Sequence, residues 1–260
     1  IRMTAGEVRL GAGSRTDAGG ASGGHIEIGG GWQGSGDLAH ARNVNIVQGA
    51  EVHADAQADG GTGGTVAVWS DGRTDFRGAI SARGKGTGAG GKIETSGRSV
   101  YITGDVNASS ERGKAGEWLI DPGNLVVRNL TGSETETDSL TDAQRVSSTL
   151  SGGTSVTVQT AGGDNGANDY SLTVQDNITK TSGGDATLTL KATGSIALNA
   201  DITSAAGKLD LEIIFDTNHL GGGNFSIANG KQLKTFGGDL KIRGGVVENR
   251  IGFANSPNMG

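Results

Sequence analysis

Two pairs of aspartates have a spacing that could support acid–base chemistry. Asp55 and Asp59 are four positions apart, and so are Asp71 and Asp75. Two carboxyl groups held at a fixed separation in a cleft can act as general acid and general base, as in the cleavage of glycosidic bonds. Both pairs, however, lie in segments typical of turns, where an Asp side chain usually accepts hydrogen bonds from its own backbone. We therefore predict turn-forming aspartates rather than a catalytic pair.

The histidines and the remaining acidic residues form no recognised metal-binding pattern. The histidines are His25, His40, His53 and His219; none belongs to a His-Glu-x-x-His motif, and their spacings fit no set of zinc ligands. His25 lies next to Ile26 and His53 next to Val52, in segments where apolar and polar residues alternate. We therefore expect both histidine side chains to point outward into solvent. An acidic cluster could hold a cation loosely, but we predict a solvated loop there: Glu134, Glu136, Asp138 and Asp142. We predict no catalytic, cofactor-binding or metal-binding residue, and no cofactor.

Glycine-rich segments match two ligand-binding loops only in part. A phosphate-binding loop needs Gly-Lys followed by Ser or Thr at the start of a helix, whereas residues 84–91 lead into a strand-like segment. The calcium-binding nonapeptide needs an Asp after Gly-Gly-x-Gly-x, but residues 60–64 are followed by Thr65 and Val66. We expect these glycines to form corners between strands.

Tryptophans and glycosylation sequons are the remaining candidates for ligand contact or modification. Trp32, Trp69 and Trp118 could form a platform on which sugar rings stack. We predict that they pack in the core or laterally instead, because Trp69 and Trp118 adjoin apolar strand-like segments. Asn-x-Ser/Thr sequons, which are potential modification sites, begin at Asn107, Asn129, Asn177 and Asn224.

Composition restricts both the fold and the partners. The 260 residues include 49 glycines, two prolines and no cysteine, which excludes collagen, disulfide frameworks and thiolate metal sites. A net charge of −6 without a block of Lys and Arg argues against nucleic-acid binding. The low apolar content allows either a disordered glycine-rich chain or a fold with a thin core.

A recurring pattern favours the thin core. Pairs of small residues, usually Gly-Gly, precede short segments in which apolar and polar residues alternate. The second residue of each pair lies at position 24, 64, 91, 116, 153, 184, 207 or 238. Alternation indicates strands with one buried face, and the Gly, Asn, Asp and Ser residues between them are typical of corners.

We therefore predict an all-β protein, a right-handed parallel β-helix whose coils each contribute two or three short strands. Another β fold and a disordered chain are the alternatives. Because each coil fills only its own layer of a narrow core, few apolar residues suffice. The residues predicted to point into this core are Ile26, Ile28, Val66, Val68, Leu188, Leu190, Leu209, Leu211, Leu240 and Ile242.

One segment interrupts the strand pattern. Apolar residues at 140, 143, 146 and 150 have helical spacing, and we predict a short helix near residues 141–150. Ser139 or Thr141 would cap its start, and Gly152-Gly153 would end it. We therefore predict that the chain has three parts: β-helix coils over 1–128, an acidic loop and short helix that decorate the solenoid over 129–152, and further coils over 153–260.

A series of motifs between Gly23 and Val127 resembles the large exoproteins of bacterial two-partner secretion, the filamentous-haemagglutinin-like adhesins and haem-utilisation exoproteins. The motifs that carry the resemblance are residues 29–34 (GGGWQG), 41–44 (ARNV), 63–71 (GGTVAVWSD), 74–84 (TDFRGAISARG), 90–97 (GGKIETSG) and 116–124 (GEWLIDPGN). The similarity is looser from Leu140 to Leu211 and fades after about residue 212. The secretion domain of these proteins is not visible, so this chain would be a segment downstream of it.

The resemblance implies a right-handed parallel β-helix, export through a partner transporter in the outer membrane, and a location outside the cell or on its surface. It implies a non-enzymatic function in adhesion or matrix formation, by contact with surface glycans or proteins. Capture of a haem-carrying host protein, with 129–152 as the binding loop, is one alternative. A polysaccharide-active enzyme on the same fold is another. We also predict end-to-end self-association, because a solenoid fragment exposes strand edges at its ends.

Overall fold

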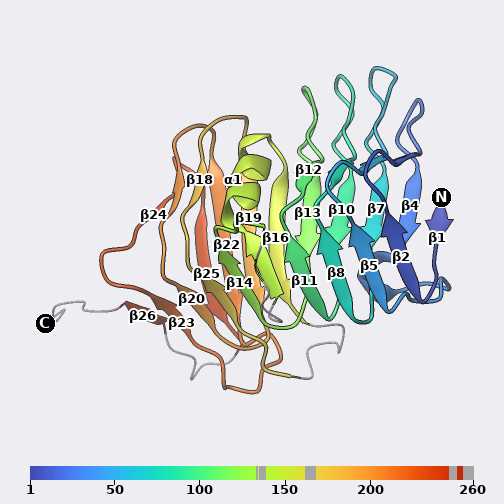
Figure 1. Cartoon of the computed structure of the whole chain (residues 1–260). Helices are drawn as coiled ribbons and strands as arrows, with labels where there is room; N and C mark the ends of the chain where they lie inside the picture. The colour runs from blue at the N-terminus through green and yellow to red at the C-terminus, as the bar shows by residue number, and fades with distance from the viewer. Residues whose placement is uncertain (133, 135–138, 162–167, 246–250, 254–260) are drawn as a thin grey trace, which may run out of the picture.

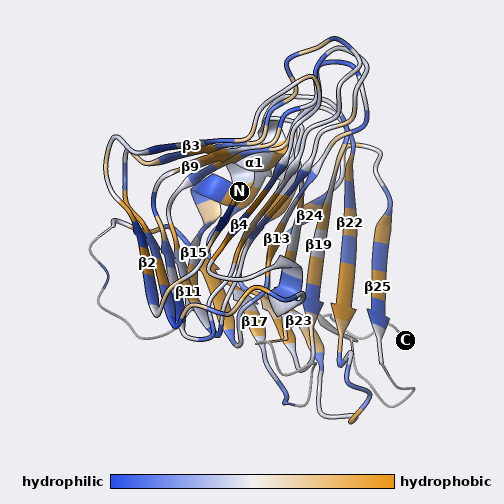
Figure 2. Cartoon of the chain, turned by 90° about the vertical axis from the view of Figure 1, so that its right-hand side faces the viewer, coloured by the Kyte–Doolittle hydropathy of each residue, from blue (hydrophilic) through white to orange (hydrophobic). Residues whose placement is uncertain are grey.

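The computed structural model describes residues 1–132, 134, 139–161, 168–245 and 251–253, and it confirms the predicted parallel β-helix (Figure 1). Every strand pairs in parallel with a strand of the neighbouring coil. Figure 2, which looks at the N-terminal end, shows three faces around a common interior. This arrangement buries the alternating apolar residues while the intervening polar residues face outward.

One face is a nine-stranded sheet, which we call sheet A. Its strands, in spatial order, are β1 (Arg2–Met3), β4 (His25–Ile28), β7 (Thr65–Val68), β10 (Lys92–Thr95), β13 (Glu117–Ile120), β16 (Ser155–Thr160), β19 (Ala186–Ala192), β22 (Leu209–Phe215) and β25 (Leu240–Gly244). The Gly-Gly pairs of the sequence lie at the entrances to these strands.

The second face is a ten-stranded sheet, sheet B. Its strands, in spatial order, are β2 (Glu7–Leu10), β5 (Asn43–Ile46), β8 (Arg73–Phe76), β11 (Ser99–Ile102), β15 (Ser139–Asp142), β14 (Leu125–Arg128), β17 (Leu172–Val174), β20 (Ile196–Leu198), β23 (Phe225–Ile227) and β26 (Ile251–Phe253).

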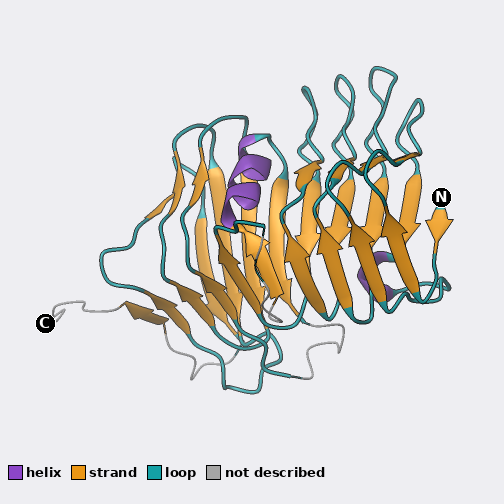
Figure 3. Cartoon of the chain, viewed as in Figure 1, coloured by secondary structure: helices purple, strands orange, loops and turns teal. Residues whose placement is uncertain are grey.

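The third face consists of two short sheets with a helix between them (Figures 1 and 3). The first sheet contains β3 (Arg15–Asp17), β6 (Glu51–His53), β9 (Ala79–Ser81) and β12 (Asp105–Asn107). The second contains β18 (Ile178–Lys180), β21 (Ile202–Ser204) and β24 (Leu233–Lys234). The helix α1 (Ala143–Ser151) contacts both β12 and β18, and so replaces the strand that this coil would otherwise contribute.

The core is a set of stacked rows, one residue per coil. In sheet A one row runs through Ile26, Val66, Ile93, Trp118, Val156, Leu188 and Leu211. Trp118 is fully buried, and its indole N–H donates to the Oγ1 of Thr95 at 2.9 Å. Thr95 belongs to the adjacent inward row, so one hydroxyl satisfies the only polar atom that the large ring brings into the core.

The predicted core residues are buried, with two exceptions at the end of sheet A. Leu240 is 47% exposed, which contradicts the prediction, and Ile242 is only partly buried against the core. Both belong to β25, the last strand of sheet A in the described part of the chain. A neighbouring coil therefore covers them on one side only.

The predicted decoration over 129–152 is partly wrong, because residues 139–151 belong to the solenoid itself. Ser139–Asp142 forms β15, which lies between β11 and β14 in sheet B. The helix follows at once, and its Val146 and Leu150 are buried in the core. Asp142, rather than Ser139 or Thr141, caps it: the Oδ1 of Asp142 accepts a hydrogen bond from the N–H of Gln144 at 3.0 Å. Gly152 and Gly153 end the helix as predicted.

Four connections between the third face and sheet A project from the first coils (Figure 1). We call residues 18–24, 54–64, 82–91 and 108–116 the glycine loops. They stack backbone on backbone: a Cβ on Gly91 would lie 2.1 Å from the carbonyl oxygen of Gly64, and a Cβ on Gly88 would lie 1.9 Å from that of Gly61. The high glycine content of the chain is thus required locally by this close approach.

Neither helix of the described structure is long and apolar enough to cross a membrane.

Candidate functional site

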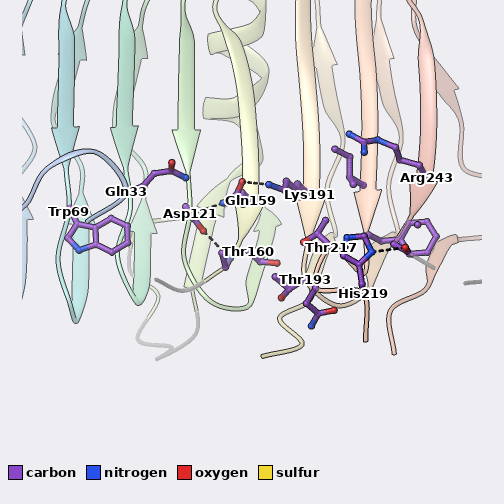
Figure 4. A pocket seen from close by; sticks show the side chains of 16 residues that line it. Gln33, Trp69, Asp121, Gln159, Thr160, Lys191, Thr193, Thr217, His219 and Arg243 are labelled. Carbon is purple, nitrogen blue, oxygen red and sulfur yellow. Dashed lines mark hydrogen bonds between the residues drawn. The ribbon is translucent and has the colours of Figure 1, made fainter. Parts of the chain in front are cut away.

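A polar groove on the outer face of sheet A is the best-formed candidate site. It has a volume of about 610 Å³ and lies at the C-terminal ends of the strands (Figure 4). Gln159, Lys191, Ile214 and Arg243 occupy one outward-facing row across β16, β19, β22 and β25. The parallel register places these four side chains side by side, although they are 23 to 32 residues apart in sequence.

A loop from the second coil closes one end of the groove. Residues 29–36, which we call the Trp32 loop, include the 3-10 turn η1 (Trp32–Gly34) and lie over the outer face of sheet A. Gly30 and Gly34 approach the ring of Trp69 so closely that a Cβ on either would lie 2.7 or 2.8 Å from a ring carbon. Trp69 is consequently 5% exposed, and its Nε1 has no hydrogen-bond partner among the described residues.

Glu94 is completely buried beneath the same loop. Its Oε2 accepts the backbone N–H of Gln33 at 2.7 Å, while its Oε1 has no partner within the described structure. Burial raises the pKa of the Glu94 carboxyl to about 8, so the group is protonated at neutral pH. Gln33 has a φ of 52°, a conformation held in place by this contact.

A chain of hydrogen bonds leads from the buried end toward the open groove. The Nζ of Lys191 donates to the Oε1 of Gln159 at 3.1 Å, and the Nε2 of Gln159 donates to the Oδ2 of Asp121 at 2.9 Å. The backbone N–H of Ala161 donates to the other oxygen of Asp121 at 2.9 Å. Asp121 is 3% exposed, and burial raises its pKa from the ordinary value. Both Asp121 oxygens are occupied, so Asp121 orients Gln159 and thereby Lys191.

The far end of the groove carries further polar groups. The Nδ1–H of His219 donates to the carbonyl of Gly245 at 2.7 Å, which leaves Nε2 as the nitrogen available to a ligand. The Nη2 of Arg243 lies 3.1 Å from the Oε1 of Glu212, in an exposed pair. Thr217 and Asn218 line the wall between them. The groove therefore offers amide, hydroxyl, imidazole and cationic groups to a ligand.

The aspartates with catalytic spacing do not converge on a common cleft. Asp55 accepts hydrogen bonds from Arg83 and Ser81 of the next coil, and Asp59 pairs with Arg112 at 3.5 Å. Asp71 contacts His40 at 2.8 Å, and Asp75 binds Arg77 at 2.8 Å. Their partners are therefore side chains that lie mostly on other coils, and not the local turn backbone that we predicted.

The acidic cluster is divided among separate structural contacts. The carboxylate of Glu134 accepts hydrogen bonds from the Tyr101 hydroxyl and the backbone of Thr131, and these lower the pKa of Glu134 to about 2. Asp142 caps α1. Glu136 and Asp138 lie outside the described residues. Across the ranges that the structure describes, no three His, Asp or Glu residues are grouped to hold a metal ion.

The histidines and tryptophans have varied surroundings. His25 is exposed beside Glu27, as predicted, whereas the His53 side chain is only 19% exposed. His53 lies 2.8 Å from the Oγ of Ser81 and 3.1 Å from Glu51, so it links two coils instead of facing solvent freely. Trp118 and Trp69 pack in the core and laterally, as predicted, while Trp32 is half-buried near the ammonium of Lys92. The asparagines of all four sequons are exposed.

No sequence motif marks Glu94, Asp121 or the row from Gln159 to Arg243 as part of a site. The alternation of Lys92, Ile93 and Glu94 correctly indicates that Glu94 faces outward. Only the contact with Gln33, 61 residues earlier, shows that this outward position is buried.

Comparison with known proteins adds no relative: no family model matches the chain, and a search of curated proteins gives no match.

Proposed function

We propose that this chain is a non-enzymatic β-helical segment of a large secreted or surface-exposed bacterial exoprotein, and that it acts in adhesion or matrix formation by extended contact. The observation that carries the proposal is the solenoid itself. Its stacked parallel coils present long, regular lateral faces, a geometry suited to contacts repeated along one axis. The resemblance to two-partner secretion exoproteins supports export and a surface location.

The contacts of the acidic side chains favour binding over catalysis. Asp55, Asp71 and Asp75 are each held by an Arg or His partner, and Asp59 lies near Arg112. None of these carboxylates faces another across a common cleft in the described structure, as a general acid and a general base would have to do. A polysaccharide-active enzyme is therefore the weaker candidate.

Capture of a haem-carrying protein by residues 129–152 also loses support. Residues 139–151 are part of sheet B and of the core, so this stretch offers a partner less free chain than the sequence suggested. A pull-down with a haem-carrying serum protein tests this alternative directly.

Attachment of protein-coated beads to epithelial cells, to matrix and to bacterial surfaces tests the proposal. We expect saturable attachment that free protein competes away, and no release of reducing ends when the protein is incubated with the polysaccharides of those surfaces. Attachment no greater than that of albumin-coated beads would contradict an adhesive function. Release of reducing ends would favour the enzyme instead.

A further inference from the structure

The groove on sheet A has features of a binding site for a specific class of ligand. Its walls carry many hydrogen-bonding side chains, and buried Asp121 orients one of them, Gln159, which in turn accepts from Lys191. Such pre-organisation lowers the entropy that a ligand must lose on binding. The groove also runs across successive strands, parallel to the solenoid axis (Figure 4).

The groups in the groove favour a saccharide over a peptide. The backbone groups of sheet A are paired between neighbouring strands, so a peptide cannot join this face as an added strand. Sugar hydroxyls both donate and accept, which suits the mixture of Gln159, Thr217, Asn218 and His219. Ile214 lies in the middle of the row and offers an apolar contact to the C–H face of a sugar ring.

The charges favour an acidic saccharide. One N–H of the Lys191 ammonium donates to Gln159, which leaves two for a ligand within the described structure. Arg243 is 63% exposed and pairs with Glu212 at the surface, where an ion pair contributes little and can be exchanged for a ligand anion. The negative charge of Asp121 is offset in part by the two N–H groups that donate to it, from Gln159 and Ala161, and its side chain is buried away from the ligand.

The spacing of the two cations specifies the ligand further. Lys191 and Arg243 share one row and are separated by the single strand β22, so their backbones are about 10 Å apart. This separation is comparable to the distance between every second sugar ring of an extended polysaccharide.

We propose that the groove binds a linear oligosaccharide with a uronic acid at every second position, aligned with the solenoid axis. One uronate lies against Lys191 and the next against Arg243, and the intervening sugar contacts Ile214 and Thr217. This inference rests on the proposed adhesive function and assigns it a site and a ligand class.

Calorimetry with hyaluronan hexasaccharide, which carries a uronate on alternate sugars, tests the proposal. Chitohexaose, a neutral polymer of N-acetylglucosamine, is the matched control ligand. We expect the hyaluronan fragment to bind at least tenfold more tightly than chitohexaose, with an affinity that falls as salt is raised. Equal affinities for the two, or no binding of either, would overturn the proposal.

Three variants locate the site. Lys191→Met keeps the aliphatic stem but removes the charge, and we expect about a tenfold loss of hyaluronan affinity. Lys92→Met is the matched control, since Lys92 faces outward on the same sheet but pairs with Glu117 outside the groove. Glu212→Gln releases Arg243, so we expect it to tighten binding two- to threefold. Equal losses in Lys191→Met and Lys92→Met would overturn the assignment, and so would weaker binding by Glu212→Gln.

The same variants separate this proposal from the proposed function. If beads coated with Lys191→Met attach to cells as well as the wild type does, adhesion uses another face of the solenoid. The groove assignment then fails as the adhesive site while the adhesive function stands.

Discussion

The coils before α1 and the coils after it differ in how the corners between the third face and sheet A are built. Before the helix, sheet A strands such as β7 and β10 are four residues long, and the glycine loops connect them to the third face. After the helix, β19 and β22 are seven residues long, and their connections to the third face shorten to residues 181–185 and 205–208. The first half is stabilised at its corners by stacked backbone, and the second by longer, more continuous strands.

Lys180 shows how a side chain fills a corner in the second half. It is fully buried at the inward end of β18, and its ammonium donates to the carbonyls of Ser182, Gly183 and Ala206. In the first half the corresponding carbonyls are reached by backbone N–H groups, as where the N–H of Gly64 donates to Ala54. One fold therefore satisfies its corner carbonyls either with backbone N–H groups or with a side-chain ammonium, and glycine is needed in both halves, since Gly183 and Gly207 have a positive φ.

The largest expected effect is that of a methyl group in the stacked glycine loops. Gly91→Ala places a Cβ 2.1 Å from the carbonyl oxygen of Gly64, and we expect it to lower the free energy of unfolding by about 4 kcal/mol. Gly184 lies two residues before β19, and no atom lies within 4 Å of a Cβ there, so Gly184→Ala should be nearly neutral. Urea denaturation measures both. Similar losses at the two positions would remove the distinction between the halves.

Glu94, which the Trp32 loop covers, should change the free energy of unfolding by a comparable amount, and this change depends on pH. The folded-state pKa of Glu94 is about 8, against an unfolded value near 4.5, so the folded state holds this proton more tightly. Its stabilising contribution is complete below about pH 4.5 and is lost as the pH rises through 8, by about 4 kcal/mol. Glu94→Gln mimics the protonated acid and should remove most of this dependence. Parallel stability curves for the variant and the wild type from pH 5 to 9 would refute the assignment.

In the coils after α1, truncating an inward-facing leucine should destabilise the protein more where coils cover the residue on both sides than where a coil covers it on one side. Leu211 is fully buried between the coils of β19 and β25, so Leu211→Ala should cost about 3 kcal/mol. Leu240 is its partner in register but is half exposed, and Leu240→Ala should cost about 0.5 kcal/mol or less. Thermal unfolding of the two variants tests this. Equal destabilisation would show that a further coil covers Leu240 in solution.

The smallest of the expected losses in stability concerns Lys180, whose side chain fills a corner after β18. Lys180→Met keeps the apolar stem but removes the ammonium donor from the carbonyls of Ser182 and Gly183, while that of Ala206 still accepts from the Ser204 hydroxyl, so we expect a loss of about 2 kcal/mol. Lys208, which is exposed near the same corner, provides a control at which the Met substitution should have little effect. If Lys180→Met proved as stable as the wild type, water would replace the ammonium without cost, and the two halves would differ less than their structures indicate.

The fold could be predicted from the sequence because its signals are local. The alternation of residues such as Ile26 and Ile28 after Gly24 specifies a strand, its buried face and its corner within a few positions. The helix was also predicted to within two residues at each end. Its cap was misassigned because Ser139–Asp142, which has no alternation of its own, forms a strand only by pairing with β11 and β14.

The site could not be predicted, because its properties come from contacts between coils. Glu94 occupies an outward position that the pattern assigns to solvent, and only the Trp32 loop makes it buried and neutral. Lys191 and Arg243 are separated by 52 positions, and the register that aligns them depends on the lengths of all the intervening corners. No short sequence pattern determines the combined length of these corners.

The helix α1 has a consequence for the response of the molecule to mechanical force. Along most of the solenoid each coil is hydrogen-bonded to the next through three faces, but between β12 and β18 the third face carries α1 instead of a strand. A load applied along the axis is borne there by the hydrogen bonds of sheets A and B and by the side chains that pack against the helix. Single-molecule stretching should therefore rupture the shaft first at this coil, in two separate events that release the regions before and after residues 143–151.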